Sequence, residues 1–404
     1  MLAGLDPLFL DGVGLSEVII VLVKAVITLV ALLVAVMLMV WFERKLVSYM
    51  QNRIGPNRAG PFGILQTLAD GIKLFFKEDL NPEKADRFVF KLAPYLSLVP
   101  AFLTFAIVPI GGNFADKDGV VEIFGHRTFL QLADPPIGVL LFLAMSSMAI
   151  YGIMLAGWSS GSKYPLLGSV RASAQMISYE AALGLAIATV FLQSRSLSTH
   201  DIVAQQAGAG FWGVVPNWNI IVTGFVPFIV FMIAATAELN RPPFDLVEAE
   251  QELVGGFHTE YSGMRFAMFF LAEFMNTITM SAIIVTLFFG GPSGPILVDA
   301  IDWFWPPLWF FLKVFVFLFT FVWFRATLPR FRYDQLMDLG WKVLIPISLL
   351  WFLFLASRNV AADRNWNWGL VVLATIAIAV IGGALLLGAI NKAKTDRDRQ
   401  DVNA

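Results

Sequence analysis

The sequence predicts an all-α fold: a polytopic transmembrane helical bundle with about nine spans, an interfacial amphipathic helix and a long acidic cytoplasmic loop. Of the 404 residues, 58% are hydrophobic and only 14% are charged, and the mean hydropathy is +0.73. Soluble domains contain roughly 45–50% apolar and about 25% charged residues. The apolar residues also gather in stretches long enough to cross a bilayer, and the basic residues gather in alternate loops.

Nine stretches contain the roughly 20 mostly apolar residues that a transmembrane helix needs. They predict one transmembrane domain, residues 1–391, followed by a polar cytoplasmic tail, 392–404. The stretches lie near 18–42, 91–111, 136–158, 170–192, 218–237, 264–289, 307–325, 341–357 and 369–391.

The distribution of Lys and Arg predicts the orientation. If the N-terminus lies outside, 21 of these residues fall in inside segments and 5 in outside segments, while Lys24 and Lys313 lie within spans. Cytoplasmic loops carry the excess of Lys and Arg. We therefore expect an outside N-terminus and a cytoplasmic C-terminus.

Composition also argues against several kinds of site. The chain has no cysteine, which excludes Cys-ligated iron–sulfur or zinc sites within it. Its three histidines are far apart in sequence, so we predict no metal site. The formal net charge of −2 gives no basic footprint for nucleic acid.

Segment 62–78 reads as an amphipathic helix that is too short and too charged to span a bilayer. Asp70, Lys73 and Lys77 recur at helical spacing on one face. The opposite face carries Ile64, Leu68, Ile72, Phe75 and Phe76. Either the helix lies in the membrane interface, or it docks against the bundle and walls a cavity, with Asp70 and Lys73 facing inward.

Three carboxylates occupy positions where charge is costly. Glu180 and Glu273 each lie nine or ten residues into a predicted span, roughly 15 Å from the inside surface, and Glu238 ends the fifth span. A charge at the bilayer centre costs at least about 2.5–3.5 kcal/mol. The alternative is a purely structural hydrogen bond between helices, but two carboxylates at matching depth favour a proton pathway.

The inside loop 238–265 is acidic, whereas the other inside loops are basic. Arg241 is its one internal base. Its acids are Glu238, Asp245, Glu248, Glu250, Glu252 and Glu260. A short helix starting near Asp245 would align Asp245, Glu248 and Glu252 in one stripe. The loop is either solvated or, as its interleaved apolar residues favour, buried against a partner or the bundle.

Three segments carry a family resemblance: Glu43-Arg44-Lys45 with Gln51 to Pro61, the run from Gly157 to Glu180, and residues 238–261. The last reads Glu-x-Asn-Arg-x-Pro-Phe-Asp-Leu-x-Glu-x-Glu-x-Glu-Leu-Val, followed by Gly-Phe and Glu-Tyr. Over about residues 16–357, the chain resembles the family of H subunits of bacterial NADH–quinone oxidoreductase (respiratory complex I), the counterparts of mitochondrial complex I subunit 1.

The resemblance implies a tilted bundle that forms much of a quinone chamber with two peripheral subunits. The chamber entrance would involve the first span, the amphipathic helix and the sixth span. Chamber-side residues carried over by motif are Glu43, Arg44, Asp70, Arg241 and Phe244. Proton-transfer residues are Asp245, Glu248, Glu250 and Glu252 near the chamber, then Glu238, Glu180 and Glu273 toward the antiporter-like subunits.

The resemblance further implies a multi-pass protein of the bacterial inner membrane whose partners are the other complex I subunits. Quinone is the substrate, with menaquinone and ubiquinone not distinguished, and FMN and iron–sulfur clusters are expected in partner subunits. Two other functions stay open at this point: a stand-alone proton-coupled transporter, and the membrane subunit of an energy-converting hydrogenase. Residues 369–391 depart from the family pattern, which usually ends soon after the eighth span.

Overall fold

The computed structural model describes residues 6–9, 12–114, 119–123, 125–208, 216–246, 250–367, 369–371, 373–375, 377–378, 381–385 and 388. The all-α fold class is confirmed: nearly all regular structure in these residues is helical, and the exception is a short β-hairpin that no sequence pattern had predicted. The hairpin pairs β1 (Val120–Ile123) with β2 (His126–Phe129) in antiparallel register, Val120 opposite Phe129.

The long helices account for most of the chain. They are α1 (Leu15–Met50), α3 (Arg87–Phe105), α4 (Gly138–Ser159), α5 (Lys163–Ser194), α8 (Phe225–Glu238), α10 (Gly263–Phe288), α11 (Trp305–Thr327) and α13 (Ile345–Asp363). The shorter helices are η1 (Pro7–Phe9), η2 (Pro61–Gly63), α2 (Gln66–Phe76), α6 (Thr199–Gln206), α7 (Asn219–Val222), α9 (Glu250–Leu253), η4 (Gly256–His258), η5 (Asp299–Phe304), α12 (Tyr333–Asp338) and η6 (Leu339–Leu344).

Within the described part of the chain, seven helices are long and apolar enough to cross a membrane, and α8 is a shorter apolar helix. Each of the first eight predicted spans falls on one of these helices. The described residues between 369 and 388 are helical, and the remainder of the predicted ninth span lies outside the described residues, as does the tail 392–404. The number of crossings stays a prediction.

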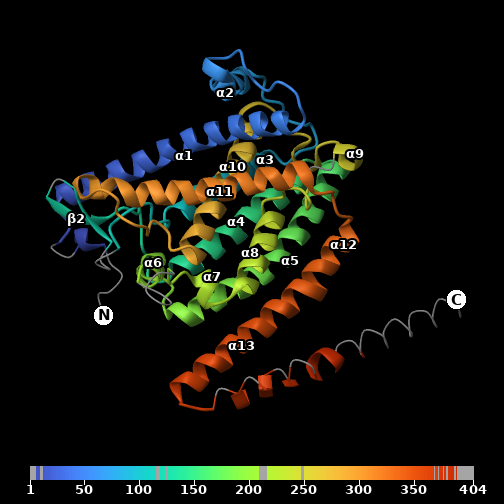
Figure 1. Cartoon of the computed structure of the whole chain (residues 1–404). Coiled ribbons are helices and arrows are strands. Elements are labelled where there is room, and N and C mark those ends of the chain that lie inside the picture. Colours follow the sequence, from blue (N-terminus) through green and yellow to red (C-terminus); the bar gives the residue numbers. More distant parts are fainter. Residues whose placement is uncertain are drawn as a thin grey trace, which may run out of the picture.

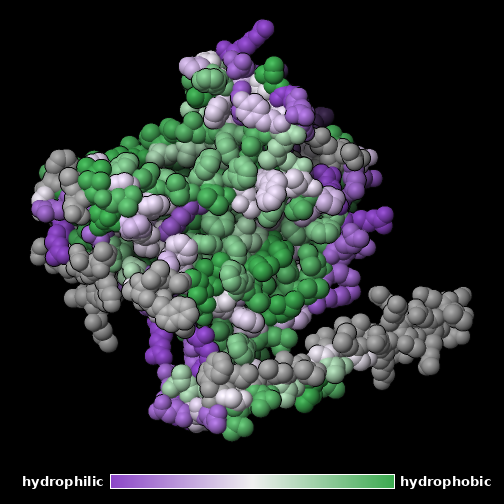
Figure 2. Space-filling model, viewed as in Figure 1, coloured by the Kyte–Doolittle hydropathy of each residue, from purple (hydrophilic) through white to green (hydrophobic). Residues whose placement is uncertain are grey.

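The helices form a tilted bundle around α10. In Figure 1, α1 and α11 run side by side across one face of it, α2 stands apart, and α13 leans away from the far side. In the most apolar part of α10, 72% of the residues are buried, compared with 6% in α1. Figure 2 shows an apolar surface over the middle of the bundle, with hydrophilic residues near α2 and the bundle ends. Thus α10 is the central helix and α1 covers the periphery.

The predicted fifth span, 218–237, is interrupted. Gly224 takes φ +84° between α7 and α8, and a Cβ there would lie 2.8 Å from the ring of Trp351. Such a φ disfavours any residue except glycine. The 14 residues of α8 extend about 21 Å, less than the roughly 30 Å of a hydrocarbon core. Glu238, at the end of α8, is consequently buried within the bundle, with 8% of its surface exposed.

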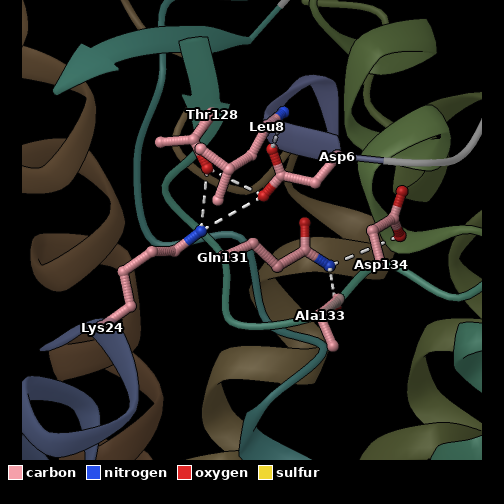
Figure 3. A network of polar contacts seen from close by, with 7 residues as sticks. All are labelled: Asp6, Leu8, Lys24, Thr128, Gln131, Ala133 and Asp134. Atoms are coloured by element: carbon pink, nitrogen blue, oxygen red, sulfur yellow. Dashed lines mark hydrogen bonds and ion pairs between the residues drawn. The ribbon is translucent and has the colours of Figure 1, made fainter. Parts of the chain in front are cut away.

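At the hairpin end of the bundle, a polar network joins three segments (Figure 3). Lys24 Nζ lies 3.2 Å from Asp6 Oδ2 and donates to Thr128 Oγ1 at 3.0 Å, and Thr128 donates to Asp6 at 2.8 Å. Lys24, which could simply have reached for the interface, instead binds η1 and β2 to α1. Beside it, Ser198 Oγ donates to both oxygens of Asp134, at 2.8 and 2.9 Å.

The environment of Asp134 predicts a pH-dependent stability. Burial raises the pKa of this carboxyl from 3.8 to about 6. The folded chain therefore binds this proton more tightly than the unfolded chain, and stability falls as the pH rises from about 4 to about 6. We expect Asp134→Asn to melt at a temperature higher than wild type by about 2–4 °C at pH 7.5 and equal to it at pH 4, measured by tryptophan fluorescence in detergent. An equal difference at both pH values would contradict this assignment.

Candidate functional site

Arg241 is the centre of an ion-pair cluster at the end of the bundle opposite the hairpin, in which Arg241 and Glu43 are buried, Glu273 is partly buried and Arg325 is exposed. Its Nη1 donates to both carboxylate oxygens of Glu43 at 3.0 Å, and its Nη2 lies 3.3 Å from Glu273 Oε1. Arg325 forms a second ion pair with Glu43. The guanidinium carbon of Arg241 lies 4.7 Å from the centre of the Phe274 ring. We call Glu43, Arg241, Glu273 and Arg325 the inner ion-pair cluster.

The cluster is held in place by electrostatics as much as by packing. Glu43 and Arg241 are 6% and 4% exposed, and charges buried to this extent persist only when they are paired. Two carboxylates and two guanidinium groups balance in formal charge. Because the four residues come from α1, the segment after α8, α10 and α11, the pairs also join four parts of the chain.

A cavity of about 470 Å³, which we call the inner chamber, lies on one side of the cluster. It is lined by Val40, Glu43, Arg44, Val47, Arg53, Pro56, Phe270, Phe274 and Arg325. Its volume falls within the range of small-molecule sites. A separate apolar cavity of about 390 Å³ is formed by α1, α10 and α11, with Phe42, next to Glu43, in its wall. Charged and apolar cavities thus occur one residue apart along α1.

The amphipathic helix is α2, and it does not dock inward. Among its described residues none is buried, and Lys73 is exposed. Asp70 instead faces α1, where its Oδ2 accepts from Arg44 Nη1 at 2.6 Å. α2 contacts α1 and α10, but Lys73 is exposed, so the expectation that Lys73 faces inward was wrong.

Glu273 also lines a second cavity, of about 70 Å³, together with Glu238, Asn240, His258 and Asn276. A cavity of this size has room for a few water molecules. Burial lowers the pKa of His258 to about 4, so its imidazole is neutral at physiological pH. His258 was not predicted as a site residue because only the acids of this loop stand out in the sequence.

Two neighbouring serines of α4 hold the remaining intramembrane carboxylates. Ser146 Oγ donates to Glu238 and Ser147 Oγ donates to Glu180 of α5. Glu238 and Glu180 are close enough to interact electrostatically. Glu273, Glu238 and Glu180 therefore lie in succession across α10, α8 and α5, and we call them the carboxylate row. The serines were missed because α4 reads as an ordinary apolar span.

The acidic loop is described in part. Asp245 lies in a turn, where Phe244 N donates to Arg241 O and Leu246 N donates to Phe244 O, each at 2.9 Å. The described part of α9 is Glu250–Leu253, and residues 247–249 lie outside the described residues, so the helix start expected near Asp245 stays a prediction. Glu248 lies outside the described residues, and the side chain of Glu250 is not described.

Two arginines bind the described acids of this loop in different places. Asp245 pairs with Arg330 at 2.8 Å and Glu252 with Arg171 at 2.9 Å. The two acids therefore do not form one repelling stripe. Phe244, predicted to be chamber-side, packs between the rings of Tyr179 and Phe331, with centroids 5.2 and 5.6 Å away.

The structure thus brings Glu43, Arg241 and Glu273 together, places Arg44 and Asp70 at the chamber edge, and adds Arg325 to the predicted set. Arg325 had been counted only as an inside charge. Among the described residues, no group of three His, Asp or Glu side chains could hold a metal ion. A charged chamber at one end of a bundle of apolar helices, followed by buried and half-buried carboxylates, defines a polytopic membrane protein with ionisable groups inside its helical bundle.

Comparison with known proteins identifies the family. A family model described as NADH dehydrogenase matches residues 23–356. The chain therefore belongs to this NADH dehydrogenase family, and the resemblance drawn from its motifs is confirmed.

Three relatives each carry the name of the H subunit of NADH-quinone oxidoreductase. The Streptomyces avermitilis protein is 49% identical over 373 residues, covering 91% of this chain and 78% of the relative. The Frankia alni protein is 49% identical over 394 residues, covering 95% and 84%. The Frankia casuarinae protein is 51% identical over 376 residues, covering 90% and 80%.

The cluster predicts a large cost for removing its central cation. Arg241→Met leaves the buried carboxylate of Glu43 and the partly buried one of Glu273 short of a partner, and breaking a buried ion pair costs about 3–5 kcal/mol. Glu43→Gln combined with Arg241→Met should recover much of this loss. The exposed pair Lys342–Asp338 provides a control, because Lys342→Met should cost at most about 1 kcal/mol. Thermal unfolding in detergent measures all three, and equal losses for Arg241→Met and Lys342→Met would refute the assignment.

Proposed function

We propose that this chain forms much of the quinone-binding chamber of a proton-translocating NADH–quinone oxidoreductase and links quinone reduction to proton translocation through its carboxylates. Its membership of the family supports a role as a membrane subunit of that enzyme. The observation that carries the finer proposal is the position of Glu273, which pairs with Arg241 of the inner ion-pair cluster and also lines the second cavity.

The inner chamber suits a quinone headgroup. Arg44, Arg53 and Arg325 line it and can donate to quinone oxygens. The apolar cavity beside Phe42 suits a hydrocarbon tail. The reducing electrons would come from FMN and iron–sulfur clusters in partner subunits, and the quinone would be menaquinone or ubiquinone.

Reduction would act on the cluster through charge. Quinone oxygens become negative until they take up protons, and this charge competes with Glu43 for Arg325. A weaker pairing of Glu43 shifts Arg241 toward Glu43 and away from Glu273, which makes proton uptake by Glu273 easier. Protons would then pass by way of the second cavity to Glu238 and by way of the paired serines of α4 to Glu180.

The surroundings of the chain follow from the same scheme. Peripheral quinone-site subunits would cover the inner chamber, and small and antiporter-like membrane subunits would receive protons beyond the half-buried Glu180. The protein would lie in a bacterial inner membrane as a single domain with an outside N-terminus and cytoplasmic C-terminus. A stand-alone transporter and a hydrogenase subunit would also use intramembrane acids, but the family match favours the quinone enzyme.

Removing the charge of the carboxylate row should impair pumping. We expect Glu180→Gln or Glu238→Gln to lower NADH-driven proton uptake into inverted membrane vesicles at least fivefold, because an amide cannot carry a proton between neighbours. Glu248→Gln should act in the same direction. Glu83→Gln, at an exposed site, is the control. Normal proton pumping in Glu180→Gln, Glu238→Gln and Glu248→Gln would refute the proposed proton pathway.

Filling the inner chamber should inhibit quinone reduction without affecting NADH–ferricyanide activity. Val47 lines the chamber, so Val47→Trp should lower quinone reductase activity at least fivefold while NADH–ferricyanide activity, which bypasses the chamber, stays within twofold. Val34→Trp, on the exposed face of the same helix, should leave both activities unchanged. Equal loss of both activities in Val47→Trp would indicate failed assembly, and full quinone activity would refute the chamber.

A further inference from the structure

We propose that Gln175 is a positioning residue: its side-chain amide holds the turn after α8 so that Arg241 faces the inner chamber while Glu238 faces the carboxylate row. This role deepens the proposed function and rests on it. Gln175 lies in α5 and lines neither the inner chamber nor the second cavity. It would therefore act only through the residues whose backbone it holds.

The geometry of the turn shows what the amide does. Gln175 is 1% exposed. Its Nε2 donates to Ala237 O at 2.7 Å, to Phe244 O at 2.9 Å and to Asn240 Oδ1 at 3.2 Å. The first acceptor precedes Glu238 by one residue and the second follows Arg241 by three. One amide therefore joins both ends of the turn.

The turn needs this support because its backbone is sharply bent. Asn240 has φ +52°, a left-handed conformation that is uncommon outside glycine. Arg241 N donates back to Thr236 O at 3.2 Å, which reverses the chain. Only two residues, Leu239 and Asn240, thus separate Glu238, bound to Ser146 of α4, from Arg241, bound to Glu43 of α1.

Without the amide, Ala237 O would keep the donor Asn240 N at 3.2 Å and Phe244 O the donor Leu246 N at 2.9 Å, each from its own end of the turn. Two hydrogen bonds of the kind that contribute about 0.5–1.5 kcal/mol each would be lost, and with them the side-chain link between the two ends of the turn, so the turn would shift. Any such shift moves Arg241 and Glu238 together, since both belong to the turn. A residue that only fills space would not tie quinone reduction to pumping in this way.

Two isosteric substitutions separate the amide's donors from its volume. Gln175→Met keeps the size and removes both donors. Gln175→Glu keeps the shape; its neutral acid can donate to one carbonyl, whereas its ionised form faces three oxygens. The matched controls are Gln206→Met and Gln206→Glu, because Gln206 is also buried and its Nε2 donates to Thr286 O at 2.9 Å and Ile202 O at 3.2 Å.

The experiment measures NADH-driven quinone reduction and proton uptake by the complex in inverted membrane vesicles from pH 6 to 9.5. Rates are normalised to NADH–ferricyanide activity, which reports assembly. Gln175→Met should lose at least fivefold in both readouts at every pH. Gln175→Glu should lie within twofold of wild type at pH 6 and fall at least fivefold below it at high pH. Both Gln206 variants should stay within twofold throughout.

Each result has one meaning. If Gln175→Glu gives the pH profile of Gln206→Glu, or if Gln175→Met keeps full activity, the positioning role is wrong. If both Gln175 variants fail to assemble, Asn240→Gly tests the role instead. This substitution removes one acceptor of the amide and tolerates the positive φ, and it should lower both readouts two- to threefold. Unchanged readouts would overturn the positioning role. Glu238→Gln, run alongside, tests the proposed function separately, since normal pumping there rejects the pathway whatever Gln175 does.

Discussion

A single buried guanidinium shared between two carboxylates organises the inner end of this molecule. Arg241 cannot leave Glu43 without exposing an uncompensated charge to a poorly hydrated interior, and Glu43 cannot leave Arg241 without relying on Arg325 alone. The helices that carry these residues are thereby fixed relative to one another. Glu43 and Arg325 of the cluster line the inner chamber and Glu273 lines the second cavity, so the arrangement helps to shape both.

The sequence was sufficient for what depends on composition and periodicity. Apolar stretches of bilayer length located the helices, and the acids at 180, 238 and 273 were recognised because charge in such stretches is costly. The motif around Arg241 identified the family. These features are local, so they can be read one segment at a time.

What could not be predicted depends on contacts between distant segments. Arg325 is 282 residues from Glu43, and no sequence pattern in either helix predicts that the two residues pair. Ser146 and Ser147 look like ordinary small residues of an apolar helix until α8 and α5 pack against them. Asp245 is 85 residues from Arg330, so the acidic loop read alone could not show their pairing either.

The shortness of α8 changes the electrical position of Glu238. Because α8 ends inside the bundle, a proton that reached this carboxylate from the inner chamber along the proposed pathway would already have moved part of the way through the membrane's electric field. Movement of a charge through the whole field corresponds to about 2.3 kcal/mol per 100 mV, and occupancy of Glu238 carries a fraction of that energy. The membrane potential generated by respiration would therefore directly oppose protonation of Glu238. The break at Gly224 shortens α8 and so would expose the first steps of proton transfer to this potential.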